Sequence, residues 1–175
     1  MAKISSVVCT ILLLCSMAKA QQPANSNNSK GQMFLVIETG SYHIPNSYFQ
    51  DAKYWDNGRL RKFNAFTPGI GFEIRLNNYF HAGAGVYRNS IYKTSGYGLI
   101  GVETSGDKPV GVGIEGGIVS GYKKSVTPTA LPYLRLGSRK GRINVKLAVI
   151  PEIENVTPYV LTAQVRVKLL RLSGM

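Results

Sequence analysis

The stretch "GIGFEIRLNNYFHAGAGVYR", residues 69–88, decides the fold, because it contains two β-strand patterns separated only by Asn77-Asn78. Apolar side chains recur at every second position on both sides of this pair, with polar or small residues between them. A period of two is typical of a strand with one apolar face. The apolar positions are Ile70, Phe72, Ile74 and Leu76 before the pair and Phe80, Ala82, Ala84 and Val86 after it.

The same period continues through the chain, and no convincing 3.6-residue helical period competes with it. Eight strands in one small chain close most simply into a barrel, which removes the exposed sheet edges. The sequence therefore predicts an all-β fold, a single eight-stranded antiparallel up-and-down β-barrel over residues 33–170. We expect its strands near residues 33–43, 67–76, 79–88, 93–104, 109–120, 129–137, 142–150 and 159–169.

The first 20 residues have the pattern of a secretory signal peptide. Lys3 supplies a positive start, residues 7–15 form an apolar run, and "AKA" at 18–20 is a small-residue cleavage site. We expect cleavage after Ala20. A lipoprotein signal built on Cys15 is the alternative.

Removal of the signal peptide limits the chemistry that the chain can carry. Both cysteines, Cys9 and Cys15, leave with it, so we expect no disulfide, no thiolate nucleophile and no Cys-based metal site. Two histidines remain, His43 and His81, which are too few for a His-rich zinc site. The sequence therefore predicts neither a metal nor an organic cofactor.

The mature chain is strongly basic. Without Lys3 and Lys19, 19 Lys and Arg stand against 9 Asp and Glu, a net charge of about +10. Nucleic acid is not expected as the partner of an exported protein, whereas anionic lipid headgroups and lipopolysaccharide phosphates are. The polar residues 21–32 are expected to form a flexible leader, and residues 171–175 a short tail.

The connections between the predicted strands alternate in length. Short turns are expected at 77–78, 105–108 and 138–141, and longer loops at 44–66, 121–128 and 151–158. All the longer loops then fall at one end of the barrel. Outer-membrane barrels have this asymmetry, with short periplasmic turns and long extracellular loops.

The alternation leaves two barrel types open. A membrane barrel would turn its apolar residues outward to lipid and place Glu73, Arg75, Lys146 and Arg166 inside. A soluble periplasmic barrel would have the inverse arrangement. Export, loop asymmetry and strand length favour the cell outer membrane, with the periplasm as the alternative.

Three residues with catalytic chemistry share the long-loop end. His43 closes the first strand, and Asn89 and Ser90 close the third, which runs in the same direction. Proximity of this kind is what base catalysis requires. His81 opens the third strand beside the short turn at 77–78, where we expect it to be structural.

Several short motifs resemble those of the outer-membrane lipid A palmitoyltransferase (PagP-like) family. The resemblance covers roughly residues 40–169, and the motifs follow the family's order and strand ends. It implies an eight-stranded barrel that moves a palmitoyl chain from a phospholipid to lipid A without a cofactor. The motifs are "YH" at 42–43, "YRNSIYK" at 87–93, "GYG" at 96–98, "PTALPYLRLG" at 128–137 and "VIPE" at 149–152.

The resemblance places the family's essential His, Asp and Ser on His43, Asn89 and Ser90. It implies that His43 acts as a base on the lipid A hydroxyl, that Asn89 orients His43, and that Ser90 positions the acyl ester. Asparagine departs from the family's aspartate, since it cannot take the charge that stabilises an imidazolium. The candidate substrate-binding residues of the same end are Tyr42, Tyr87 and Arg88.

The prolines and glycines carry a related expectation. Pro128 and Pro132 begin the sixth predicted strand and Pro151 ends the seventh, and proline cannot donate a ladder hydrogen bond. The resemblance implies a lateral gate for an acyl chain there; the alternative is that these prolines only terminate strands. Five glycines lie opposite the larger apolar residues of their strands: Gly83, Gly85, Gly111, Gly113 and Gly117. If they face the lumen, they make room there for an acyl chain; the alternative is that they relieve crowding where strands coil strongly.

Two functions are therefore open. The first is an outer-membrane acyltransferase that resembles the lipid A palmitoyltransferases. The second is a non-enzymatic barrel that binds a lipid or another apolar ligand, or that has a structural role in the envelope. In either case the expected partner is membrane lipid, either phospholipid or lipid A of lipopolysaccharide, and the expected state is a monomer.

Overall fold

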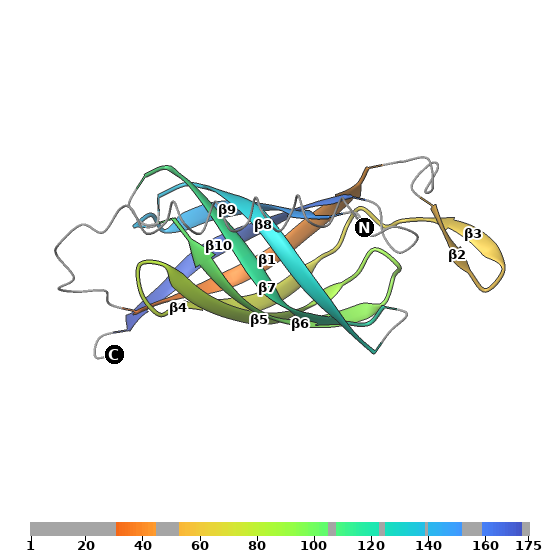
Figure 1. The fold of residues 1–175 in the computed structure, drawn as a ribbon, viewed down its shortest axis with the longest axis horizontal. Coiled ribbons are helices and arrows are strands. Elements are labelled where there is room, and N and C mark those ends of the chain that lie inside the picture. The colour runs from red at the N-terminus through yellow and green to blue at the C-terminus, as the bar shows by residue number, and fades with distance from the viewer. Residues whose placement is uncertain are drawn as a thin grey trace, which may run out of the picture.

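Eight strands of the computed structural model close into one antiparallel barrel, as the alternating pattern predicts (Figure 1). Each strand pairs with its neighbours in the barrel order, and β1 closes the ring between β10 and β4. The described residues contain no helix that is long and apolar enough to cross a membrane. The barrel strands are β1 (Gly31–His43), β4 (Gly69–Arg75), β5 (Phe80–Arg88), β6 (Thr94–Glu103), β7 (Val110–Ser120), β8 (Val126–Leu136), β9 (Ile143–Ile150) and β10 (Val160–Leu172).

The structure describes residues 31–44, 53–104, 108–122, 125–138, 140–151 and 159–172. The predicted signal peptide, residues 21–30 of the predicted leader and residues 173–175 of the predicted tail lie outside these ranges, as do parts of the predicted loops and of two predicted turns. The remaining short turn joins β4 and β5 through residues 76–79, one residue longer on each side than the expected 77–78. Its Asn77 Oδ1 accepts hydrogen bonds from the backbone N–H groups of Tyr79 and Phe80, both at 2.8 Å.

A two-stranded hairpin lies within the predicted 44–66 loop and was not predicted. It consists of β2 (Lys53–Asp56) and β3 (Arg59–Lys62), and it projects beyond one end of the barrel (Figure 1). Asn57 and Gly58 form its turn, with φ of 49° and 77°. An Asn-Gly pair favours this turn conformation, so the pair was the available signal; strands of four residues are too short for alternation to be evident.

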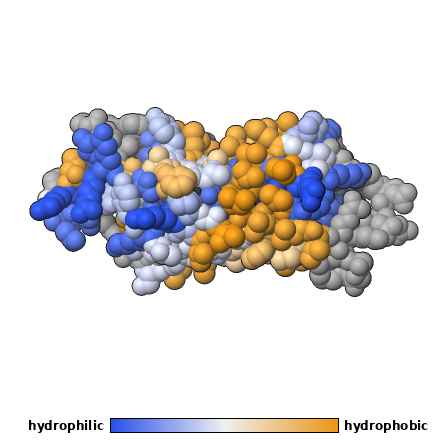
Figure 2. Space-filling model, turned by 180° about the vertical axis from the view of Figure 1, so that it is seen from behind, coloured by the Kyte–Doolittle hydropathy of each residue, from blue (hydrophilic) through white to orange (hydrophobic). Residues whose placement is uncertain are grey.

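The apolar side chains of the strands face outward, and the predicted charged positions face inward. Ile100 is 71% exposed and Phe72 is 47% exposed, whereas Glu73 is 2% exposed. Figure 2 shows hydrophobic side chains over much of the barrel wall, with the hydrophilic hairpin at the left end. The barrel therefore has an apolar outer wall, the inverse of a water-soluble barrel.

A network of ion pairs fills the interior next to the short turns. Arg75 Nη2 donates to Glu103 Oε2 at 2.7 Å. Arg166 Nη1 donates to Glu73 Oε1 at 2.9 Å, and Lys146 Nζ donates to Glu73 Oε2 at 3.2 Å. The four residues predicted to point inward, Glu73, Arg75, Lys146 and Arg166, are all at most 4% exposed.

Toward the long loops the interior holds mainly apolar and aromatic side chains, with Gln164 hydrogen-bonded to Glu38 among them. Large side chains fill the space above lumen-facing glycines: a Cβ at Gly113 would lie 2.4 Å from Tyr133 Cζ, and one at Gly85 would lie 2.7 Å from Tyr97 Cζ. The interior cavity beside Tyr97 holds about 10 Å³, room for about one water. These two glycines accommodate large inward side chains and do not widen the lumen. The apolar cluster consists of Leu99, Leu131, Tyr133 and Ala148, with Tyr97 and Ile150 packed against it.

Candidate functional site at the long-loop end

His43 ends β1 at the long-loop end of the barrel, where the sequence places it. Its side chain is 7% exposed. The imidazole stacks on the ring of Phe63, with a centroid separation of 4.1 Å and an interplanar angle of 3°. Tyr54 of the hairpin stacks in turn on Phe63 at 5.1 Å. The hairpin and the residue that follows it therefore cover the histidine.

Asn89 organises the turn between β5 and β6. Its Oδ1 accepts hydrogen bonds from the backbone N–H groups of Ile91 at 3.0 Å and Lys93 at 2.9 Å. Its Nδ2 donates to Ser95 Oγ at 2.9 Å and to the Gly121 carbonyl at 3.0 Å. An asparagine side chain offers two donor hydrogens and an oxygen with two lone pairs, so this one is fully used. A carboxylate could not donate to the Gly121 carbonyl, which gives a physical reason for asparagine here.

Ser90 belongs to a chain of hydroxyls that runs across the same end. Its side chain lies beside Tyr122, whose hydroxyl lies 3.2 Å from that of Tyr87. Tyr87 in turn lies beside Ser95, the residue that accepts from Asn89. Burial raises the pKa of Tyr122, so its phenol stays neutral and can donate a hydrogen bond. The chain therefore connects Ser90 with the partner of Asn89.

The residues Phe63-Asn64 bring His43 and Ser90 into one region. Phe63 stacks on His43, and the N–H of Asn64 donates to the Ser90 carbonyl at 2.8 Å. Within the described residues no hydrogen bond joins His43 to Asn89 or to Ser90. The three candidate catalytic residues thus share one end of the barrel through common neighbours rather than through direct contact.

The candidate substrate-binding residues point in different directions. Tyr87 lies on the inner face with the hydroxyl chain. Tyr42 is 62% exposed and lies on the outer face, opposite Leu161 of β10. Arg88 is also exposed, and its Cζ lies 5.7 Å from the centroid of the Tyr92 ring. Tyr87 therefore shares the interior with Ser90, whereas Tyr42 and Arg88 belong to the outer rim.

Strands β8 and β9 separate on the long-loop side. Their ladder covers only residues 133–136 against residues 145–148, although β8 pairs with β7 along its whole length of 11 residues. Among the described residues, 126–132 of β8 therefore pair only with β7; continuing the register places 126–129 opposite residues 152–155, which lie outside the described ranges.

The prolines explain this separation. The N–H of Gly137 donates to the Pro109 carbonyl of the β7 side at 2.7 Å. Because antiparallel backbone groups alternate between the two neighbouring strands, the nitrogens of Pro128 and Pro132 face β9, where they have no hydrogen to donate. Continuing the β8–β9 register places Pro151 opposite Ala130. The three candidate gate prolines thus border the unpaired segment.

One interior cluster has the residue types of a metal site. Glu73, His81 and Glu115 place ligand atoms within 4.8 Å of one another. Lys146 Nζ donates to both carboxylates, and His81 Nε2 lies 2.8 Å from Glu115 Oε1. Lys146 and Arg166 therefore already supply the positive charge that balances these carboxylates, and His81 belongs to the ion-pair network.

Sequence reasoning missed Phe63, Ser95 and Tyr122. Ser95 is the cross-strand partner of Tyr87, so a correct assignment of the inner face would have indicated it. Tyr122 follows β7 at the predicted long-loop end, among other candidate residues. Nothing in the sequence points to Phe63, since its role depends on the unpredicted hairpin.

Comparison with known proteins assigns no family. No family model matches the sequence, and no curated protein matches it at a significant level. The likeness to lipid A palmitoyltransferases therefore rests on the short motifs, and the function is argued from the geometry.

Proposed function

We propose that the protein is an outer-membrane barrel that takes up an acyl chain laterally and transfers it at the long-loop end. The apolar outer wall supports the membrane location, because side chains such as Ile100, 71% exposed, are stabilised by lipid rather than by water. The charged groups would then be kept from the hydrocarbon, inside the barrel.

The unpaired segment of β8 is the observation that carries the acyl-transfer proposal. It leaves the wall without a hydrogen-bond ladder between residues 126–132 and β9. Directly inside lie Leu131 of β8 and Ile150 of β9, which belong to the apolar cluster. An acyl chain that passes this wall would replace apolar contacts by similar ones, and the packed side chains of Leu131 and Ile150 would have to move apart to admit it.

The site residues then have the following roles. The His43 imidazole removes the proton from an acceptor hydroxyl, whose oxygen attacks the ester carbonyl of the donor phospholipid. The ester C–O bond breaks, and the departing lysophospholipid oxygen takes the proton from the imidazolium. Ser90, held by Tyr122, donates a hydrogen bond to the ester oxygen. Asn89 shapes the turn that presents Ser90.

Mass analysis of lipid A tests this proposal. Cells that express the protein should contain lipid A with one additional acyl chain, and His43→Ala and Ser90→Ala should abolish that product. Each variant is compared with wild type by heat-modifiable gel migration, which reports the folded barrel. Unchanged lipid A from cells that contain correctly folded wild-type protein would exclude the activity.

A non-enzymatic barrel is the second candidate. Asn89 favours it, because all its hydrogen-bonding positions are used within its own turn and its neighbours. On this alternative, "RNS" is a structural turn and the barrel binds lipid without changing it. Normal folding with unchanged lipid A is its expected result.

A further inference from the structure

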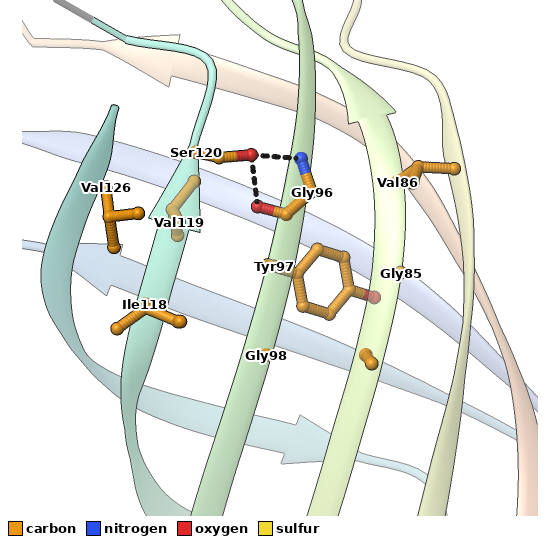
Figure 3. A pocket seen from close by; sticks show the side chains of 10 residues that line it. Gly85, Val86, Gly96, Tyr97, Gly98, Ile118, Val119, Ser120 and Val126 are labelled. Atoms are coloured by element: carbon orange, nitrogen blue, oxygen red, sulfur yellow. Dashed lines mark hydrogen bonds between the residues drawn. The ribbon is translucent and has the colours of Figure 1, made fainter. Parts of the chain in front are cut away.

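A groove crosses the outer wall of the barrel over β5, β6, β7 and the start of β8. Its volume is about 640 Å³, and Figure 3 shows the glycines of β6 between the side chains of the neighbouring strands. The interior site described above is on the other face of these strands. The residues that line the groove include Ala84, Val86, Gly96, Gly98, Ile118 and Val126.

The floor of the groove is open because β6 has no side chain there. A Cβ added at Gly98 would meet no atom within 4 Å. Ser120 Oγ accepts a hydrogen bond from the Gly96 N–H at 2.9 Å, which satisfies that backbone group without filling the groove. The walls are apolar: Val86, Ile118 and Val126 are each more than half exposed to the outside.

A cationic side chain stands at the long-loop end of this groove. Val86 is paired with Gly96 and Arg88 with Thr94, so Arg88 follows Val86 by two positions and lies on the same outward face. Arg88 is exposed, and its guanidinium lies near the Tyr92 ring. Among the described residues it has no carboxylate partner. An apolar trough thus ends at a guanidinium that has no carboxylate partner in the described part of the chain.

We propose that this groove binds one phospholipid, with an acyl chain over Gly96 and Gly98 and the phosphate at Arg88. A guanidinium can bind a phosphate through two parallel hydrogen bonds, and the glycine floor lets a flexible chain lie against the strand. The inference rests on the membrane location proposed above and not on acyl transfer. Val126 connects the groove with the unpaired segment of β8, so the bound lipid would lie beside the lateral opening.

The test is lipid retention by the purified, folded full chain in detergent micelles, measured by native mass spectrometry. The probes are palmitoyl-oleoyl phosphatidylglycerol and, as the control that lacks a phosphate, the matching palmitoyl-oleoyl diacylglycerol. Wild type should retain one phosphatidylglycerol in preference to diacylglycerol. Arg88→Ala should weaken phosphatidylglycerol binding by about tenfold, the value of one or two hydrogen bonds to a charged group, and should remove the preference.

Gly98→Trp tests the groove itself, because the new side chain has room and would occupy the place of the acyl chain. Ile100→Trp is its matched control, since Ile100 lies two residues along the same outward face and outside the groove. Gly98→Trp should lose the bound lipid and Ile100→Trp should keep it. Gly98→Leu replaces Gly98→Trp if heat-modifiable migration reports misfolding.

Equal lipid retention by the Gly98 and Ile100 variants would overturn the groove, and an unchanged headgroup preference in Arg88→Ala would overturn the phosphate contact. The outcome of this lipid-retention experiment does not depend on whether the protein transfers an acyl chain. Loss of lipid in Gly98→Trp with unchanged lipid A in cells would leave the groove in place and exclude acyl transfer. Additional lipid A acylation with no selective lipid retention would support acyl transfer and exclude the lipid-binding groove.

Discussion

The half of the barrel next to the short turns is held by ion pairs, whereas the half next to the long loops is held by apolar contacts and hydroxyls. In the first half Glu103 and Glu73 each receive hydrogen bonds from two cations, and these directional contacts fix the strands. In the second half the contacts of Leu131 are non-directional and the β8–β9 ladder is absent. One half of the barrel therefore specifies the closed ring of strands, and the other half can open.

The largest expected effect is in the ion-pair half. Glu103→Ala leaves the guanidinium groups of Arg75 and Arg135 buried without their shared carboxylate, which should destabilise the barrel by about 3–5 kcal/mol. Leu131→Ala in the apolar half should cost less, about 2 kcal/mol, because the site borders the unpaired strand and can collapse. Urea unfolding of the barrel in lipid vesicles measures both, and a larger loss for Leu131→Ala would contradict the comparison.

The outer wall should respond to charge according to depth. Ile100 lies near the middle of the paired strands, and Ile100→Arg should cost about 2–4 kcal/mol if that wall faces hydrocarbon. Val110 begins β7 beside a short turn, and Val110→Arg should cost only about 0–1 kcal/mol near the interface. Folding titrations in vesicles give both values. Equal tolerance of the two changes would argue for a wall in contact with water.

Asn89→Asp separates the structural and catalytic roles of this position. The carboxylate loses the donation to the Gly121 carbonyl, so stability should fall by about 1–3 kcal/mol. Asn78→Asp in the exposed β4–β5 turn is the control and should be close to neutral. If acyl transfer is detected, a rise in its rate in Asn89→Asp would indicate that the site uses a carboxylate, despite the weaker turn.

The smallest expected effect is at the opening. Pro132→Ala supplies an N–H on the β9 side, which should extend the ladder and stabilise the barrel by about 0.5–1.5 kcal/mol. Amide hydrogen exchange of Val149, which the register places opposite Pro132, should slow, and any acyl transfer should slow with it. Pro109→Ala, next to the start of β7 at the short-turn end of the neighbouring strand, should leave this amide unchanged. Unaltered exchange in Pro132→Ala would mean that the proline does not keep the strands apart.

Asn144 lies on the inner face, where the alternation alone predicts that an added charge costs little. The structure places Asn144 Oδ1 2.6 Å from Arg166 Nε, so Asn144→Arg would bring a second buried guanidinium against the first. The alternation indicates which way a side chain points, but not which charge already occupies the space.

By itself, the sequence determined the number of barrel strands, their approximate limits and the division of each strand into an apolar and a polar face. It could do so because strand geometry turns successive side chains to opposite sides, so the pattern is local. It also placed His43, Asn89 and Ser90 at one end, since antiparallel order follows from the strand count.

Only the tertiary structure decided what those faces contact. Whether the apolar set points out or in depends on barrel closure, because alternation is the same in both cases. The four hydrogen bonds of Asn89 join residues up to 32 positions apart, and the outer groove exists because Gly96 and Gly98 lie between Val86 and Ile118 on neighbouring strands. Contacts between strands are set by register, which no single strand encodes.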